Sequence, residues 1–193
     1  MKLLFITGNM QKADEVKAIL APIEVEQRKL DIPEIQGTAE EIAREKARLA
    51  CQELQQPVFV DDTSLEVHAW QGLPGPYIKE FLDKLKSQQF ADMLEKFDDR
   101  TAHAVCMIVY TEPGKEPLLF RGIVEGTIIK QARGESRHPL GKNFGYDPIF
   151  VPKGHTKTFA EMSKEEKNGL SHRMKALLQF KQYLLADRSE KQT

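Results

Sequence analysis

The chain has 193 residues, 30% of them charged, and a formal net charge of −1 at pH 7. A net charge so close to zero argues against a broad nucleic-acid-binding surface, so any phosphate-binding region must be local. The length is sufficient for a substantial core, and we expect a single domain over residues 1–193, with two lobes and a frayed tail from about residue 187.

The cysteines, Cys51 and Cys106, lie in helix-like and strand-like segments without a partner motif. This pattern favours reduced core thiols and a cytoplasmic location. The apolar start MKLLFIT is too short to predict a signal peptide or a membrane span.

The first predicted elements are a strand, a glycine turn and a helix, a layout that can cradle phosphates. The strand covers Leu3 to Ile6, and the helix follows the turn TGNMQK. Asn9 has a simpler interpretation as the helix cap. Lys12 favours an anion, because a cation in the first turn of a helix opposes the helix dipole. The candidate triphosphate cradle consists of Thr7, Gly8, Asn9 and Lys12.

A second strand is predicted from Ile23 to Lys29, followed by the loop LDIPEIQG, which contains Glu34. A lone glutamate in a loop is usually solvated, so only its neighbours can give Glu34 a function. The next helix opens at Thr38, which forms a capping box with Glu41.

Two charged residues fall on the apolar face of this helix, which begins after Thr38. They are Lys46 and Glu53. Either the two form an internal ion pair, or Lys46 reaches past the apolar side of the helix to an anion.

The stretch PVFVDDTSL joins a short buried strand to two adjacent carboxylates. Residues 58–60 are β-branched or aromatic, as in a buried strand that ends at Asp61 and Asp62. In an open α/β sheet, ligands bind at the carboxyl edge of the strands, so both acids are candidate site residues. The alternative is that they only begin a turn.

The middle of the chain is predicted to be rich in β-structure. Before it, glycines and prolines at residues 72–76 force a tight turn, and Lys79 lies at the beginning of the helix that follows. His68 and Trp70 are interpreted as packing residues. The remaining predictions are a short amphipathic helix, Phe90–Phe97, and a β-hairpin of Thr101–Thr111 and Leu118–Ile129.

The loop from Arg133 to Asp147 is basic and glycine-rich, and it carries two aromatic rings near its end. Exposed rings on a loop suit stacking on a nucleobase. The alternative is that Phe144 and Tyr146 plug the core beneath the loop.

The last helix is predicted to begin at Ser171, a natural N-cap, with His172 and Arg173 in its first turn. Positive charge at this end of a helix again opposes the dipole, so we suspect a site there. Lys167 lies just upstream, on the connection to this helix.

A series of motifs resembles the inosine triphosphate pyrophosphatases in order and approximate spacing: TGNMQK, DIPEIQG, VDDTSL, GLPGPYIK, FGYDPIF and SKEEKNGLSHR. The resemblance spans Leu3 to about Tyr183. It implies an α/β fold in which helices flank an elongated mixed β-sheet, with two lobes, a central nucleotide-binding cleft and, usually, a homodimer. It also implies hydrolysis of the deaminated purine nucleotides ITP, dITP and XTP to the monophosphate and pyrophosphate, with Mg²⁺ as the cofactor.

Carried over residue by residue, the resemblance assigns three groups of side chains. The triphosphate contacts are Thr7, Gly8, Asn9, Lys12, Lys46 and Lys79. The magnesium carboxylates are Glu34 and Asp62, and Asp62, together with Asp61, is tied to activation of the attacking water. Phe144 stacks on the base, and the rest of the base pocket consists of Gly145, Tyr146, Asp147, Lys167, His172 and Arg173.

The chemistry of these side chains agrees with the resemblance. Mg²⁺ prefers oxygen ligands and is commonly held by one or two carboxylates together with substrate phosphates. It lowers the pKa of a bound water, and a carboxylate can accept the proton as water attacks the α-phosphorus. Arg173 and His172 can donate to the C6 carbonyl of hypoxanthine or xanthine but pair poorly with the C6 amino group of adenine.

Two departures from the family pattern are present. The segment ESRHPLGK lengthens the loop before FGYD, and Thr63-Ser64 follows the acids where a Ser-Gly pair is frequent among relatives. Two other functions remain open: a nucleotide-sensing module that does not hydrolyse, and a nucleotidase with another base preference.

Overall fold

The computed structural model describes residues 2–134 and 145–190. It contains a mixed sheet of seven strands with helices packed against it, which confirms the predicted α/β class. The chain divides into two compact units. Unit 1 comprises Met1–Asp62, Cys106–Gly122 and His172–Thr193, and unit 2 comprises Thr63–Val105 and Ile123–Ser171.

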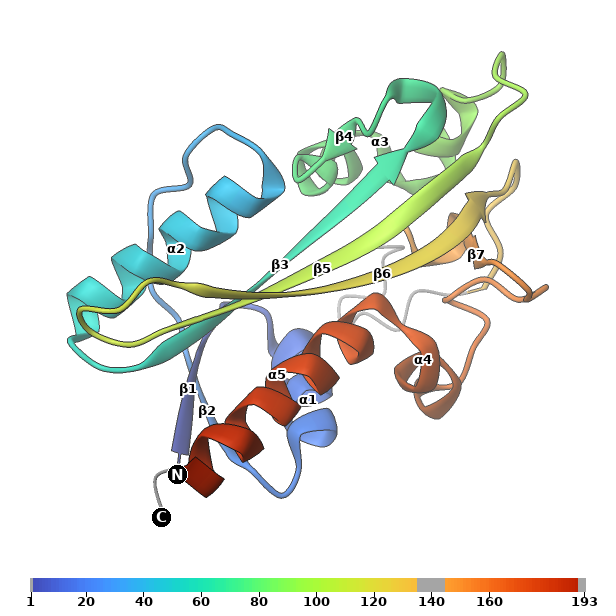
Figure 1. Ribbon diagram of the computed structural model, residues 1–193. Helices are drawn as coiled ribbons and strands as arrows, with labels where there is room; N and C mark the ends of the chain where they lie inside the picture. The colour runs from blue at the N-terminus through green and yellow to red at the C-terminus, as the bar shows by residue number, and fades with distance from the viewer. Residues whose placement is uncertain (1, 135–144, 191–193) are drawn as a thin grey trace. The chain divides into compact units, whose positions relative to one another are not determined.

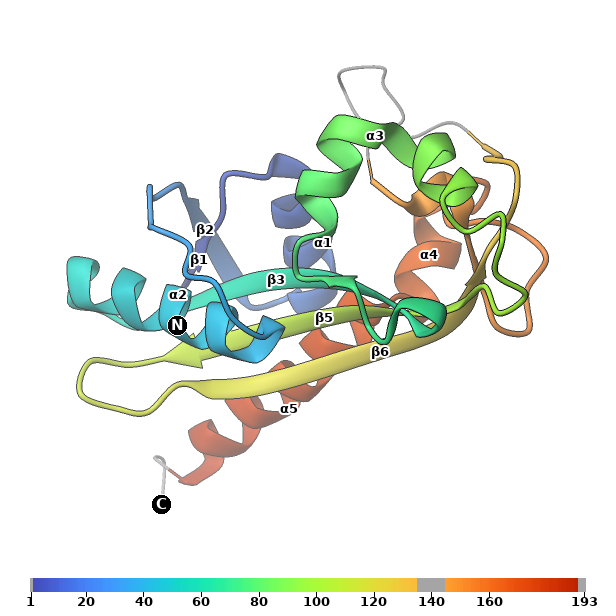
Figure 2. The same ribbon diagram turned by 90° about the horizontal axis from the view of Figure 1, so that it is seen from above.

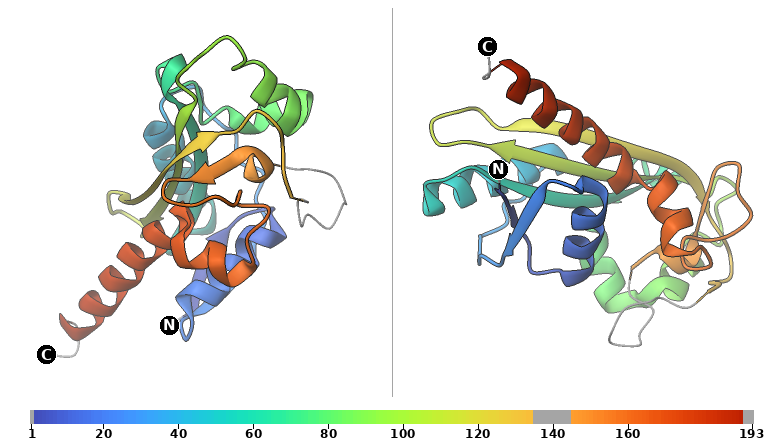
Figure 3. Two further views of the ribbon diagram at one scale, coloured as in Figure 1. Left: turned by 90° about the vertical axis from the view of Figure 1, so that its right-hand side faces the viewer. Right: turned by 90° about the horizontal axis from the view of Figure 1, so that it is seen from below.

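Unit 1 has helices on both faces of its part of the sheet. Its strands follow the order β2-β1-β3-β5-β6, with β1 parallel to both β2 and β3. Helix α2 lies on one side of these strands, and α1 and α5 lie on the other (Figure 1; Figure 3, right). The elements are β1 (Lys2–Ile6), α1 (Met10–Leu20), β2 (Glu24–Arg28), α2 (Ala39–Leu54), the first half of β3 (Val58–Val67), parts of β5 (Thr101–Thr111) and β6 (Leu118–Ile128), and α5 (His172–Glu190).

The core of unit 1 follows from strand alternation. Successive side chains of a strand point to opposite faces, so every second residue faces α1 and α5. Phe5 and Phe59 stack on this face with ring centroids 4.6 Å apart, and Phe180 of α5 packs against Phe59 at 5.2 Å. Cys106 belongs to the same buried cluster, and both Cys51 and Cys106 are buried free thiols, as predicted.

Unit 2 contains the remaining strands and the helices α3 and α4. Its core packs α3 against the far halves of β3, β5 and β6, together with the segment that follows Tyr146. Helix α3 is bent at Lys86, whose backbone is not helical (Figure 2). The further elements are η1 (His68–Trp70), β4 (Pro74–Gly75), α3 (Ile78–Asp92), η2 (Asp147–Ile149), β7 (Phe150–Pro152) and α4 (Lys164–Leu170).

Strand β3 corrects the prediction that a strand ends at the two carboxylates. It continues through Asp61 and Asp62 to Val67, and neither acid begins a turn. Pairing with β4, in which Leu65 lies opposite Gly75, keeps the segment extended. It is β1 that ends here, since its last pairing joins Ile6 to Val60.

Several helix predictions also need correction. The amphipathic helix expected over Phe90–Phe97 is only the end of α3. After Asp92 the chain forms tight turns, in which Leu94, Glu95 and Phe97 each donate to the carbonyl three residues earlier. Helix α5 continues to Glu190 instead of fraying at residue 187. Helix α4 was missed, although Ser163 and Glu166 form a capping box that the sequence displays. Among the described helices, none is long and apolar enough to cross a lipid bilayer.

Candidate active site

Asp61 is the centre of a buried charge cluster in unit 1. Its side chain is 0% exposed, and Lys12 Nζ donates to Oδ1 at 2.6 Å and to the Asp61 carbonyl at 3.2 Å. Arg173 Nε donates to Oδ2 at 2.6 Å, and the Cys106 thiol lies 3.6 Å from the same oxygen. Burial alone raises the pKa of Asp61, but Arg173 and Lys12 outweigh it and hold that pKa far below the ordinary value. Asp61 is therefore ionised and is a poor proton acceptor.

The same cluster explains why cations occupy the first turns of α1 and α5. Lys12 and Arg173 both find their counter-charge in Asp61, so neither lysine nor arginine faces the helix dipole alone. Arg173 also donates to Glu15 of α1 through Nη1. Glu15 was not predicted, although it follows Lys12 by three residues on one helix face, the spacing at which side chains share a face.

A second cluster in unit 1 contains Glu34, Lys46 and Asp62. Lys46 Nζ lies 3.1 Å from Glu34 Oε1 and 3.1 Å from Asp62 Oδ1. Burial lowers the pKa of Lys46, but the two carboxylates raise it more, so the pKa lies above its ordinary value. Of the two alternatives for Lys46, the structure confirms that it reaches past the apolar face of α2 to anions, while Glu53 is exposed.

The alternation of β3 separates the roles of the two adjacent acids. Asp61 lies on the face of Phe59, toward α1 and α5, while Asp62 points to the opposite face, where α2 supplies Lys46. Asp62 Oδ2 is buried and has no hydrogen-bond partner among the described residues. A carboxylate oxygen of this kind, with a second carboxylate held close by one lysine, fits a site for a hard cation such as Mg²⁺.

The glycine turn after β1 is a helix cap, as its simpler interpretation predicted. Asn9 Oδ1 accepts from the backbone N–H of Gln11 at 3.0 Å and of Lys12 at 3.2 Å. Thr7 Oγ1 in turn accepts from the N–H of Asn9 at 3.1 Å. These bonds fix the turn, and a contact of Thr7, Gly8 or Asn9 with phosphate stays a prediction.

Gly122 of β6 is a structural requirement of the site that the sequence analysis missed. A Cβ at this position would lie 2.0 Å from the carbonyl oxygen of His172 and 2.6 Å from the nitrogen of Ala176. Only a glycine lets the first turn of α5, with His172 and Arg173, sit this close to the strand. A glycine inside a β-rich run was the signal for such a close approach.

We expect Gly122→Ala to lower the free energy of unfolding by about 2 kcal/mol, because the added methyl group meets backbone atoms that must move. Urea denaturation measures this loss. Gly169→Ala is the matched control, since a Cβ there meets no atom within 4 Å and alanine favours a helix. Equal stability of Gly122→Ala and the natural chain would contradict the requirement.

The base-side residues predicted in unit 2 form a smaller group. Lys167 Nζ lies 2.5 Å from Asp147 Oδ2, which joins α4 to the start of η2. The carbonyl of Gly145 accepts from Ser87 Oγ at 2.8 Å. Lys79 is exposed in the first turn of α3.

The ring of Tyr146 is buried, which decides between its two interpretations in favour of the core. It is 6% exposed and packs against Phe150 with centroids 6.0 Å apart, so it plugs the core of unit 2. Phe144 and the segment ESRHPLGK lie outside the described residues. The stacking role of Phe144 therefore stays a prediction.

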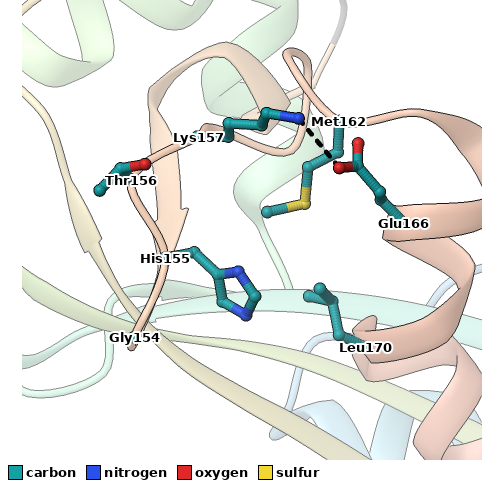
Figure 4. A pocket seen from close by; sticks show the side chains of 7 residues that line it. All are labelled: Gly154, His155, Thr156, Lys157, Met162, Glu166 and Leu170. Atoms are coloured by element: carbon teal, nitrogen blue, oxygen red, sulfur yellow. Dashed lines mark hydrogen bonds and ion pairs between the residues drawn. The ribbon is translucent and has the colours of Figure 1, made fainter.

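A pocket of about 350 Å³ in unit 2 lies beside α4, and it is separate from the predicted residues. His155, Met162 and Leu170 point into it, and the ion pair of Lys157 with Glu166 crosses its rim (Figure 4). None of its lining residues belongs to the predicted site. The site is therefore built from the charge clusters and not from this pocket.

Comparison with known proteins gives close matches over nearly the whole chain. An Aspergillus fumigatus protein named inosine triphosphate pyrophosphatase is 50% identical over 95% of this chain and 95% of its own. A Yarrowia lipolytica protein of the same name is 47% identical over 98% of each chain.

Solved structures and a family model agree with these matches. The Ham1 proteins of Staphylococcus aureus and Coxiella burnetii superpose with TM-scores of 0.82 and 0.84, each at 30% identity, and the superpositions cover 97% and 96% of this chain and 100% and 99% of those proteins. The model of the Ham1 family matches residues 3–183. The chain belongs to the Ham1 family.

Proposed function

We propose that this protein hydrolyses the deaminated purine nucleoside triphosphates ITP, dITP and XTP to the monophosphate and pyrophosphate, and so cleanses the nucleotide pool. The observation that carries the proposal is that the adjacent acids Asp61 and Asp62 lie on opposite faces of β3 and have different partners. Asp61 anchors two cations on one face of β3, while Asp62 keeps an unsatisfied buried oxygen on the other. The names of the fungal relatives support the substrate class.

Glu34 and Asp62 are the residues that would hold Mg²⁺. Carboxylates from separate elements suit this ion, which keeps several waters and usually shares its coordination with substrate phosphates. When bound, Mg²⁺ supplies charge that polarises the phosphoryl oxygens and makes a water more acidic.

The chain's own residues supply the rest of the chemistry. Asp62 is the group that accepts the proton of the attacking water, because Asp61 is committed to Lys12 and Arg173. Lys12 gives two of its three N–H donors to Asp61, and its third can meet a phosphate oxygen. Lys46 and Lys79 add charge that stabilises the departing pyrophosphate.

Base selection is proposed for the start of α5 and for the residues of unit 2. Arg173 is held by Asp61 and Glu15, so the plane of its guanidinium is fixed, and His172 beside it is buried. A buried donor that pairs with the C6 carbonyl of hypoxanthine or xanthine is left without a partner by adenine. Lys167, Asp147, Gly145 and Tyr146 are proposed contacts of the base pocket, and Phe144 is proposed to stack on the base.

Product analysis tests this function. The protein is incubated with Mg²⁺ and, separately, ITP, XTP, dITP, GTP or ATP, and the products are separated by ion-exchange chromatography. We expect IMP and pyrophosphate from ITP and little product from ATP. IDP with phosphate, or binding without turnover, would refute the proposal.

We also propose that the protein is a cytoplasmic homodimer. The family resemblance supports the dimer, and the buried free thiols Cys51 and Cys106 suit a reducing compartment. Light scattering coupled to size-exclusion chromatography measures the oligomeric state. A monomeric mass at micromolar concentration would contradict the dimer.

A further inference from the structure

Lys46 lies between the two carboxylates that would hold a divalent cation. Its Nζ is equidistant, at 3.1 Å, from one oxygen of Glu34 and one oxygen of Asp62. The three side chains come from the loop after β2, from α2 and from β3. Without a cation between them, the two carboxylates would repel each other.

The lysine neutralises this pair incompletely. It donates to Asp62 Oδ1, while Asp62 Oδ2 is buried without a hydrogen bond among the described residues. A buried acceptor left unsatisfied costs free energy, so the arrangement with lysine alone is not the best one available to Asp62. A divalent cation carries twice the charge of the ammonium group and can engage more carboxylate oxygens.

Lys46 is also able to leave. Its side chain is 20% exposed, and a flexible four-carbon stem joins its ammonium group to α2. Rotation within this stem moves the ammonium group without moving the helix. A lysine stem of this kind can keep its place while the charged head changes partner.

We propose that Lys46 is an exchangeable counter-ion, which holds Glu34 and Asp62 together until a divalent cation displaces it and frees its ammonium group for the phosphates. The cation then competes with a built-in charge, so the free protein binds it weakly. When the cation arrives together with a triphosphate, the cost of displacing Lys46 is offset, because its ammonium group then pairs with phosphate oxygens. The inference deepens the proposed function and rests on it only for the second half of the exchange.

Binding of Mn²⁺ without nucleotide tests the exchange directly. Mn²⁺ prefers the same oxygen ligands as Mg²⁺, and electron paramagnetic resonance counts the free ion. We expect Lys46→Met to bind Mn²⁺ about tenfold more tightly than the natural chain, equivalent to about 1.4 kcal/mol. Lys46→Gln should behave in the same way, and it serves if the methionine variant does not fold.

Two controls separate competition from a general change of charge. Arg48→Met removes one positive charge from the same helix, where Arg48 makes only a surface pair with Glu45 among the described residues. Its Mn²⁺ affinity should change by less than about twofold, since exposed charges are screened. Lys46→Arg keeps the charge and should stay near the natural affinity. Unchanged or weaker Mn²⁺ binding by Lys46→Met would overturn the exchange.

Mn²⁺ binding and pyrophosphate release, measured side by side, keep the two proposals distinct. Tighter Mn²⁺ binding by Lys46→Met, with no release of pyrophosphate from ITP by the natural chain, would refute the function and leave the exchange standing. Release of pyrophosphate by the natural chain, without any gain in Mn²⁺ affinity by Lys46→Met, would refute the exchange alone.

Discussion

Asp62→Asn is expected to lower kcat for ITP by about a thousandfold, because the amide cannot accept the proton of the attacking water. It also removes one of the two carboxylates proposed to hold the metal. Lys12 keeps its own carboxylate, Asp61, so the contact proposed between Lys12 and the triphosphate stays in place. Nucleotide binding should therefore largely survive.

Turnover is measured as pyrophosphate release, and nucleotide binding by isothermal titration calorimetry. Asp14→Asn is the matched control, since it makes the same chemical change at an exposed position of α1. This control should keep the natural kcat. Unchanged turnover in Asp62→Asn would remove Asp62 from the proposed chemistry.

Much of the secondary structure follows from local sequence signals. The helix caps at Asn9 and Thr38 and the hairpin of β5 and β6 were predicted from residues within a few positions of each other. These signals are local because a cap or a turn satisfies its own backbone groups. The capping box of Ser163 carried the same information and was overlooked.

The separation of Asp61 from Asp62 depended on where β3 ends. Alternation already assigns adjacent strand residues to opposite faces, so a strand that continued to Val67 would have divided the two acids. The prediction placed the end of the strand at the acids, because polar residues often mark a turn. Tertiary pairing with β4 overrode that preference.

The partners of Asp61 could not be predicted from local sequence. Lys12 and Arg173 are 49 and 112 residues away from it along the chain. Their position at helix starts indicated that each needed an anion, and only the fold shows that they share the same one. Gly122 is a similar case, since the start of α5 that packs against it lies far from it in the sequence.

Asp61→Asn is expected to destabilise the protein by about 3 kcal/mol, since removing one partner of a buried ion cluster leaves charge uncompensated. The asparagine would present an NH₂ group where one carboxylate oxygen now accepts, and that group would face the N–H donors of Lys12 or Arg173. Urea denaturation at pH 7 measures the loss. Asp62→Asn, whose side chain is 23% exposed, should lose less than about 1 kcal/mol.

The pH dependence of this difference tests whether the charge of Asp61 is the cause. In the folded protein the pKa of Asp61 is held far below the ordinary value of about 3.9, which the unfolded chain retains. A lowered folded pKa stabilises the protein fully above the unfolded value and progressively less as the pH falls below it. The gap between the natural chain and Asp61→Asn should therefore be full at pH 7 and narrow below about pH 4. A gap that stays constant down to about pH 2.5 would show that packing, not the ionised carboxylate, explains the loss.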